Sequence, residues 1–304
     1  MNGNLVLRLS GDGINSSPGT STNSIQEGFQ VLAHLADQPF TQEYLCVKLC
    51  RLLVHDDFAH GYDFTDPNLS AEGQLVRACM QAWESSSPKG QIRKVLEVIL
   101  NSELFRSQSA SMQKVKTPFE FTVSAVRALR AQMTDGTYTA NTDPNNGVRS
   151  PINRMGRMRL FDREEPDGWP EAGVPWISAG TLTERLRFVQ SLLLPNVANV
   201  SRPDASGSVA DPVRLLKAKL PQSAWTDAAA VAEYFVNILY PGEGRANLDE
   251  YRQTAVWYLN MADNGTTASS FSALDPNGAA NGPYDLRVRG MVAMLMTFPR
   301  FQEQ

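Results

Sequence analysis

The sequence predicts a mainly α-helical fold, a multi-helix orthogonal bundle in which two related helical units flank a central helical segment. Three observations support this prediction. Apolar residues recur at helical spacing along most of the chain. A sharply defined helix start lies in the middle of the chain. The alternating pattern of a strand is clear only in Leu5–Leu9.

The clearest helix start lies at Thr117, within the segment Lys114–Arg130. Thr117 can cap the helix because its side-chain oxygen accepts a backbone N–H of the first turn. Pro118 falls at the first helical position, where it loses no hydrogen bond, and Glu120 completes a capping box. The apolar residues of this helix recur at helical spacing: Phe119, Val123, Val126 and Met133.

Four helices are expected before this central helix. Residues 1–23 are rich in Gly, Ser, Asn and Thr and are expected to form a flexible segment. The first helix begins at Ser24, and Thr41 and Ser70 are expected to cap the second and third helices. Helical periodicity is carried in the first helix by Phe29, Leu32 and Leu35, and in the fourth by Ile92, Val95, Leu96, Ile99 and Leu100.

Long loops and two further helices follow the central helix. Residues 134–150 and 161–176 are too rich in Gly, Asn, Pro and Trp to form regular elements. A short helix is expected between these loops, over residues 151–158. A longer helix over residues 181–194 is followed by a polar linker, residues 195–211.

The last third of the chain repeats the first third. Helices correspond in order, and the matching residues are Glu43-Tyr44 with Glu233-Tyr234, Asn68-Leu69 with Asn247-Leu248, Arg93 with Arg289, and Phe105 with Phe301. An internal duplication explains this order. We therefore expect a main helical domain of residues 24–194 and a C-terminal helical unit of residues 211–304 that packs on it.

Composition excludes several functional classes. The 304 residues are 42% apolar and 20% charged, which is typical of a globular protein. A net charge of −4 gives no basic field for nucleic acid, and no apolar run approaches the roughly 20 residues that span a bilayer. Met1–Ser10 does not resemble a signal peptide, so either the protein is cytoplasmic or the chain lacks its natural N-terminus.

The three cysteines are expected to be buried. Cys46 and Cys50 lie four residues apart on the second helix and therefore share a face, and no further metal ligand is close to them in sequence. We interpret both, with Cys79, as small core hydrophobes. A disulfide from Cys79 to either of the other two is the alternative, which spacing does not decide.

A loop rich in metal-ligand residues follows the second helix. His55, Asp57, His60 and Asp63, together with Asp56 and Asp66, offer six ligands within twelve residues and can in principle hold a divalent cation such as calcium or zinc. No EF-hand or zincin spacing is present. The simpler interpretation is a solvated loop whose acids cap the neighbouring helices.

A second candidate site combines acids with tryptophans. Asp162, Glu165 and Asp167, with Glu164 beside them, precede Trp169 and Trp176. Glycosidases use an acid pair next to aromatic rings on which a sugar stacks. The simpler interpretation is a structural loop whose tryptophans fill the core and whose acids pair with neighbouring arginines such as Arg163.

Several segments in this order resemble one bacterial family. They are Lys114-Val-Lys-Thr-Pro-Phe-Glu120, Arg127-Ala-Leu129, Met155-Gly156, Pro166-Asp-Gly-Trp-Pro170 with Trp176, Leu45–Val54, and Phe298-Pro-Arg-Phe301. Residues 30–304 thus resemble the C-terminal half of the domain of unknown function 1800 family. The resemblance implies a periplasmic or extracellular bacterial protein, with a sulfatase-like exported protein as a neighbour and partner. It implies no catalytic residues, and the family's helical N-terminal half and signal are missing here, as in a fragment.

Two functional hypotheses follow. The first is a non-catalytic helical interaction or scaffold portion of an exported bacterial protein. The second is a metal-assisted or acid–base hydrolase acting on glycans. Convergence of the two polar loops on one cleft would favour the second hypothesis, and separated or salt-bridged acids would favour the first.

Overall fold

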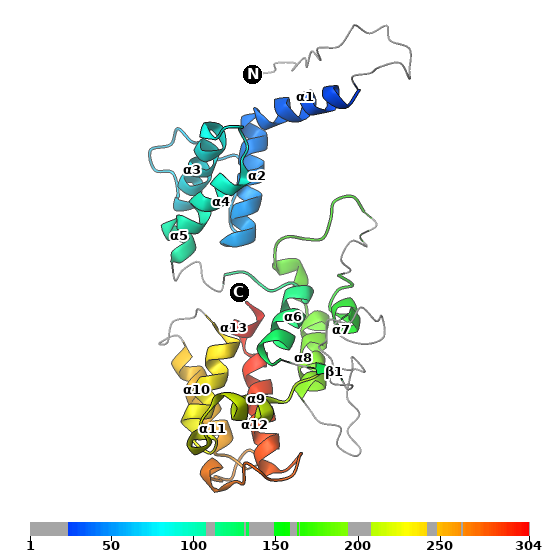
Figure 1. Cartoon of the computed structure of the whole chain (residues 1–304), viewed down its shortest axis with the longest axis vertical. Helices are drawn as coiled ribbons and strands as arrows, with labels where there is room; N and C mark the ends of the chain where they lie inside the picture. The colour runs from blue at the N-terminus through cyan, green and yellow to red at the C-terminus, as the bar shows by residue number, and fades with distance from the viewer. Residues whose placement is uncertain are drawn as a thin grey trace. The chain divides into compact units, whose positions relative to one another are not determined.

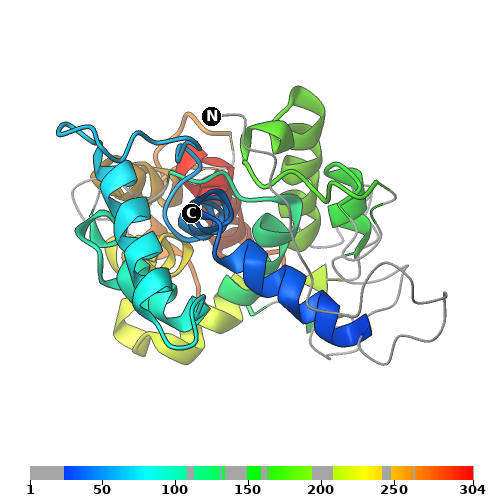
Figure 2. The ribbon, with the colours of Figure 1, turned by 90° about the horizontal axis from the view of Figure 1, so that it is seen from above.

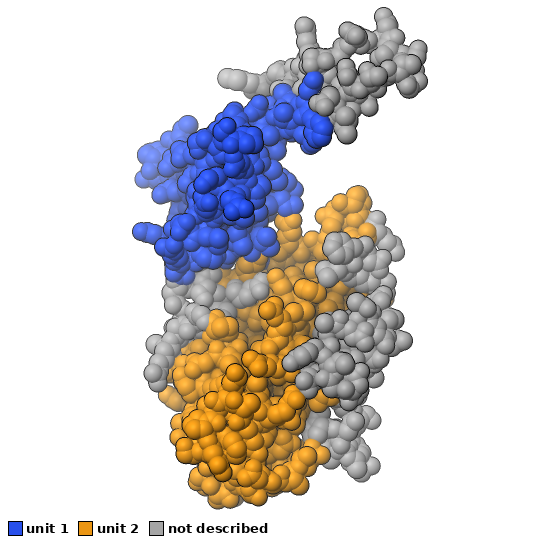
Figure 3. Space-filling view, viewed as in Figure 1, with its two compact units in different colours: residues 1–110 blue, residues 111–304 orange. Residues whose placement is uncertain are grey.

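The computed structural model describes residues 24–107, 113–130, 132–133, 149–158, 163, 165–193, 208–241, 248–262 and 264–303. Helices make up most of these residues, which confirms the predicted mainly α fold (Figure 1). The chain forms two compact units, unit 1 (Met1–Ala110) and unit 2 (Ser111–Gln304) (Figure 3). The predicted strand Leu5–Leu9 lies outside the described residues.

Unit 1 consists of helices that pack in chain order. They are α1 (Ser24–Ala36), α2 (Pro39–Leu53), α3 (Ala71–Ser85), α4 (Ile92–Asn101) and α5 (Glu103–Arg106). α3 packs on both α2 and α4, whereas α1 contacts α2 and accepts one hydrogen bond from α3, donated by Trp83 Nε1 to the Ala36 carbonyl at 3.0 Å. α1 runs at a steep angle to α2, which Figure 2 shows almost end-on. The core contains all three cysteines, as expected, with Val76, Trp83 and Ile99 among the other buried residues.

One predicted cap in unit 1 is confirmed and one is wrong. The Ser70 side chain accepts a hydrogen bond from the Gly73 backbone N–H at 3.2 Å, so α3 is capped as expected. Thr41 is not a cap, because α2 begins two residues earlier at Pro39. A proline is well placed at the first helical position because its φ angle is already helical and it has no N–H to leave unpaired.

Unit 2 surrounds one large apolar core. Its elements are α6 (Pro118–Ala128), β1 (Gln132–Met133), α7 (Arg149–Arg154), η1 (Val174–Trp176), α8 (Ala179–Leu193), β2 (Ser208–Val209), α9 (Pro212–Lys219), η2 (Gln222–Ala224), α10 (Ala228–Leu239), α11 (Asp249–Leu259), η4 (Phe271–Ala273), α12 (Pro283–Thr297) and α13 (Pro299–Gln302). The short strands β1 and β2 pair antiparallel, with Gln132 opposite Val209.

The predicted start of the central helix is confirmed in detail. Thr117 accepts a hydrogen bond from the Glu120 N–H at 3.3 Å, and the Glu120 carboxylate accepts one from the Thr117 N–H at 2.8 Å. The cap fixes the orientation of α6, which buries Phe121 against Phe188 of α8 and Phe301 of α13. Aromatic edge contacts of this kind add to the burial of apolar area in holding the helices together.

The core of unit 2 draws on both halves that the sequence analysis separated. Phe121 and Phe188, from the expected 24–194 domain, belong to the same buried cluster as Phe235, Leu295 and Phe301, from the expected 211–304 unit. Whether these two halves also fold as separate domains stays a prediction. What the packing establishes is that α6 and α8 cover the helices α10 and α12.

Candidate functional site

The two histidines of the first polar loop contact different neighbouring residues. His55 is buried, lies against Phe58, and has its Nε2 3.7 Å from the Glu72 carboxylate. His60 is exposed and stacks on Tyr44, with ring centroids 5.4 Å apart. The imidazoles therefore serve two separate packing contacts.

The acids of this loop are turn residues. Asp63 accepts hydrogen bonds from the Thr65 backbone N–H and hydroxyl at 3.0 and 2.6 Å, which lower the pKa of its carboxyl. Asp57 is exposed, and its backbone N–H donates to His55 Nδ1. Within the described residues, no three His, Cys, Asp or Glu side chains lie together in a way that could hold a metal ion. The candidate ligands His55, Asp57, His60 and Asp63 are thus near in sequence without forming a coordination shell there.

The acids of the second polar loop gather around one arginine. Arg163 contacts Glu165 at 3.1 Å and Asp167 at 3.3 Å. Asp162, the third candidate acid, lies outside the described residues, as does Glu164. Both described carboxylates are exposed and pair with the same guanidinium, so this part of the loop is an ion-pair cluster at the surface.

The two tryptophans of this loop adjoin the arginine cluster. The Trp169 and Trp176 ring centroids are 6.0 Å apart, and the Arg163 guanidinium lies 4.9 Å from the Trp169 centroid. Trp176 is buried and donates its Nε1–H to the Pro170 carbonyl at 3.1 Å. Gly156 approaches Trp176 so closely that an added Cβ would lie 3.1 Å from the ring. Trp176 is therefore a packing residue, whereas the half-buried Trp169 is accessible in part.

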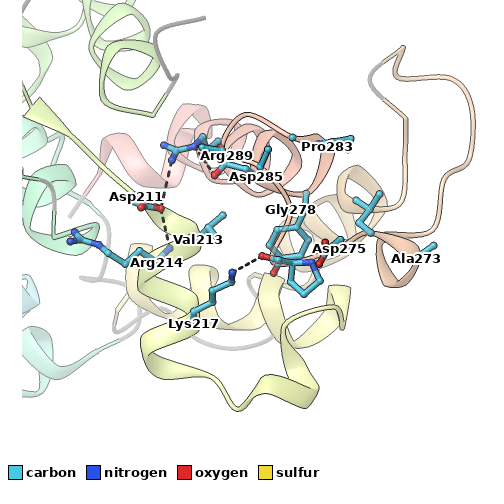
Figure 4. A pocket seen from close by; sticks show the side chains of 16 residues that line it. Asp211, Val213, Arg214, Lys217, Ala273, Asp275, Gly278, Pro283, Asp285 and Arg289 are labelled. Atoms are coloured by element: carbon cyan, nitrogen blue, oxygen red, sulfur yellow. Dashed lines mark hydrogen bonds and ion pairs between the residues drawn. The ribbon is translucent and has the colours of Figure 1, made fainter.

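Unit 2 also contains a cleft that the sequence analysis did not find. It has a volume of about 660 Å³ and lies between α9, the loop 273–282 and the first turns of α12 (Figure 4). Lys217 of α9 reaches the loop and donates hydrogen bonds to the Pro276 carbonyl and to Asn277 Oδ1. The residues that line the cleft come from two separate parts of the chain, residues 211–217 and 273–289, and no motif in the sequence connects them.

The inner wall of the cleft is a buried ion pair. Arg289 Nε donates to both carboxylate oxygens of Asp285, at 3.0 and 2.9 Å. Its Nη1 donates to the carbonyls of Leu193 and Ala210, and Asp285 also accepts the Asn281 N–H. These bonds compensate for taking the two charges out of water. The pair therefore joins α12 to the end of α8.

Charges around the cleft balance one another. Arg214, Lys217 and Arg289 face three acids among the lining residues, namely Asp211, Asp275 and Asp285. The Tyr284 ring is buried and stacks on Phe271, so it offers no open face to a sugar. The cleft has room for a small molecule, yet its charged groups are engaged in holding α9, α12 and the loop together.

Fold and site together define a mainly helical protein in which described acids of the second polar loop and of the cleft pair with arginines. The chain belongs to the family described as protein of unknown function (DUF1800), whose model matches residues 13–303. The predicted family is thus confirmed, and the match begins closer to the N-terminus than the expected residue 30, so its restriction to a C-terminal half is too narrow. No curated protein and no solved structure matches the chain. Within the described residues, no helix is long and apolar enough to cross a membrane.

Proposed function

We propose that the chain is a non-catalytic, protein-binding portion of an exported bacterial protein. The observation that carries this proposal is a set of exposed large apolar side chains on the first two helices of unit 1. They are Phe29, Leu32 and Leu35 on α1, and Phe40 and Leu52 on α2. A periplasmic or extracellular location is part of the proposal.

The exposure is unusual because the pattern of α1 is that of a helix with a buried face. Phe29, Leu32 and Leu35 recur at intervals of three residues, which places them on one side of the helix. Leu32 nevertheless has 61% of its surface exposed, and Phe40 has 83%. Contiguous exposed apolar side chains on a helical surface are typical of a site for another protein.

The energy available from this surface is sufficient for specific binding. Full burial of a leucine or phenylalanine side chain contributes roughly 1.5–3 kcal/mol. Three such residues would provide about 5–9 kcal/mol before the costs of association, which is the range of hot-spot clusters in protein interfaces. Glu165 and Asp167 both pair with an arginine, and this arrangement supports catalysis less well than the apolar surface supports binding.

The test uses a sulfatase-like exported protein from the same genome as the binding partner. Purified chain and purified partner are mixed in a calorimeter, and the dissociation constant is measured for wild type, Leu32→Glu and Phe40→Glu. Each charged substitution is expected to weaken binding at least about tenfold. Glu165→Gln is the matched control on the acidic loop and is expected to leave binding unchanged. Equal affinity for all four proteins would contradict the role of this surface.

The alternative is a hydrolase acting on glycans, and one observation favours it. Glu165, Asp167 and Trp169 adjoin the same arginine, so an acid pair and an aromatic ring are neighbours as sugar chemistry requires. The test is hydrolysis of soluble glycans with and without divalent cations, compared with the Asp167→Asn variant. Turnover lost in this variant at unchanged thermal stability would replace the binding proposal by the enzymatic one.

A further inference from the structure

The two units contain the same succession of helices. In unit 1, α2 packs on α3, α3 packs on α4, α2 also contacts α4, and the short α5 follows directly. In unit 2, α10, α11, α12 and the short α13 follow the same plan. The residues that match in sequence fall at equivalent positions of the two units. Ile99 of α4 corresponds to Leu295 of α12, and Phe105 of α5 corresponds to Phe301 of α13.

Burial agrees on the inner face of the matching helices. Val95 and Ile99 of α4 are completely buried, as are their counterparts Met291 and Leu295 of α12. A three-helix core is therefore built in the same way in both units. Because burial agrees on the inner face, the burial of the remaining apolar residues can be compared between the matching helices.

Burial differs at other apolar positions of the same helices and of the short helices that follow them. In unit 2, Val288, Met296 and Phe301 are at most 1% exposed. Their counterparts in unit 1 are equally apolar but open to solvent, at 41%, 44% and 36%, and they are Ile92, Leu100 and Phe105. We call Ile92, Leu96, Leu100 and Phe105 the α4–α5 face. Unit 1 thus has apolar residues at the same positions as unit 2, but they are open to solvent.

The cover in unit 2 is a helix whose end is held by an arginine. α8 packs along α12, and α6 brings Phe121 to 5.5 Å from Phe301. Arg289 of α12 donates to the carbonyl of Leu193, the last residue of α8, at 3.0 Å. Cations are favourable at this position because the final carbonyls of a helix are unpaired and carry a partial negative charge.

Unit 1 has kept the arginine as well as the apolar residues. Arg93 occupies the position of Arg289, one residue after Ile92, and its side chain is exposed. Among the described residues, no hydrogen bond or ion pair engages Arg93. The α4–α5 face therefore offers both parts of the surface that receives α8 in unit 2, an apolar stripe and a cation at one end.

We propose that the α4–α5 face binds an amphipathic α-helix of a partner protein, in the manner in which α8 covers α12, with the C-terminal carbonyls of that helix directed at Arg93. This inference rests on the proposed binding function and specifies a partner element for it. The partner helix needs apolar residues at intervals of three and four, as α8 has with Phe188, Val189 and Leu192. Complementarity with Arg93 fixes the direction in which the helix runs.

The test uses α8 itself as the probe. A peptide of residues 179–193 carries a fluorophore at its N-terminus and a staple between positions 183 and 187, which are exposed in the folded chain. The staple is needed because a free peptide of this length is only marginally helical. Fluorescence anisotropy is measured while the full chain is titrated into the peptide. The matched control peptide has Phe188→Ser and Leu192→Ser.

The expected result is saturable binding by the stapled peptide and none by the control peptide. Leu100→Asp in the full chain should raise the dissociation constant about 10- to 100-fold, the loss expected for one buried leucine. Arg93→Gln should raise it several-fold. Leu186→Asp in the full chain, at a leucine that is 44% exposed like Leu100 but lies in unit 2, should change it less than about twofold.

Thermal melts exclude an effect on folding. Because the α4–α5 face is exposed, Leu100→Asp should keep the melting temperature within about 2 °C of wild type, whereas Met296→Asp in the covered counterpart should lower it by many degrees. A large drop for Leu100→Asp would overturn the proposal, because the face would then belong to the folded core.

Other outcomes are equally decisive. Absence of binding, or binding that Leu100→Asp leaves unchanged, overturns the proposal. A dimer in sedimentation velocity that Leu100→Asp dissociates would assign the face to a second copy of the chain instead. Phe40→Glu separates this inference from the function proposed above, since it should weaken binding of the sulfatase-like protein at least about tenfold and leave binding of the α8 peptide unchanged. Loss of only one of the two interactions then identifies which proposal has failed.

Discussion

Burial of a protonated lysine is expected to make the stability of unit 2 depend on pH. Lys116 is buried, its Nζ donates to the Phe301 carbonyl at 2.8 Å, and it lies 4.3 Å from the centroid of the Phe301 ring. The Arg185 guanidinium is buried nearby and donates to the Lys116 carbonyl. Burial, reinforced by the Arg185 cation, lowers the pKa of Lys116 to about 8.

The sign and size of the effect follow from this pKa. The ordinary pKa of lysine, 10.5, applies to the unfolded chain, so between pH 8 and 10.5 the unfolded chain holds a proton that the folded chain has lost. The free energy of unfolding therefore rises with pH through this window. A shift from 10.5 to about 8 corresponds to roughly 3 kcal/mol in total, of which about 2 kcal/mol is gained between pH 7 and 10.

The assay compares wild type with Lys116→Met in urea unfolding followed by circular dichroism at pH 7, 8, 9 and 10. Methionine keeps the length of the side chain and removes its charge. Other groups, such as Tyr284, whose pKa burial raises to about 12, titrate alike in both proteins and cancel in the difference. We expect wild type to gain about 2 kcal/mol relative to the variant over this range.

The control is Lys94→Met, because Lys94 is exposed and pairs only with Glu97 on the surface of α4. Its stability should follow that of wild type at every pH. If the curves of wild type and Lys116→Met were parallel from pH 7 to 10, the lysine would not be buried as a cation, and the packing of Phe301 over it would be wrong.

Three further predictions test packing, the buried ion pair and metal binding. Gly173→Ala should destabilise the chain by roughly 1–3 kcal/mol in urea, because the new Cβ would lie 2.4 Å from the Val115 Cβ, whereas Gly180→Ala, with its nearest neighbour at 3.9 Å, should not. Arg289→Met should cost roughly 3–5 kcal/mol by leaving Asp285 buried and unpaired, and the exposed Arg187→Met serves as its control. Calcium, zinc, magnesium and manganese should leave the melting temperature of chelator-treated chain unchanged; a selective shift lost in Asp57→Ala would instead establish a metal site.

Local signals predicted the helix starts where the side chain itself makes the cap. Thr117 with Glu120, and Ser70, are in this class, because the capping bonds join residues at most three apart. The start of α2 was misplaced at Thr41 because a capping residue close to a proline leaves two admissible starts, and Pro39 determines the outcome. The two possible start residues lie within one turn of helix, so the error in the predicted helix boundary is small.

Periodicity predicted which residues share a face but not what that face contacts. The pattern of Phe29, Leu32 and Leu35 indicated a helix, and α1 is one, yet these residues are exposed. The similar pattern of α4 divides, with Ile99 buried and Leu100 exposed. A hydrophobic stripe in the sequence shows that one face of a helix is apolar. Which element packs on that face depends on the tertiary structure.

The geometry of the candidate sites could not be predicted from the sequence, because metal binding and catalysis depend on distances between side chains in the fold. The spacing of His55 and His60 gave no hint that one would pack near Phe58 and the other on Tyr44. Arg289 and Asp285 lie one helical turn apart, but the other partners of Arg289, the carbonyls of Leu193 and Ala210, are 96 and 79 residues away in the chain. Sequence gives the ligands of a site only when they are neighbours in one element.

If the two units correspond as proposed above, one sequence pattern serves two purposes. In unit 2, Arg289 contacts the end of α8 within the same chain and Met296 is buried, so this surface is part of the core. In unit 1, Arg93 and Leu100 retain the same chemistry in solvent, where an unsatisfied apolar surface disfavours solubility. A surface with this cost persists more readily if a partner covers it than if it has no role. The exposure of Leu100, at the position where Met296 is buried in unit 2, is therefore the observation on which the proposed binding role of the α4–α5 face rests.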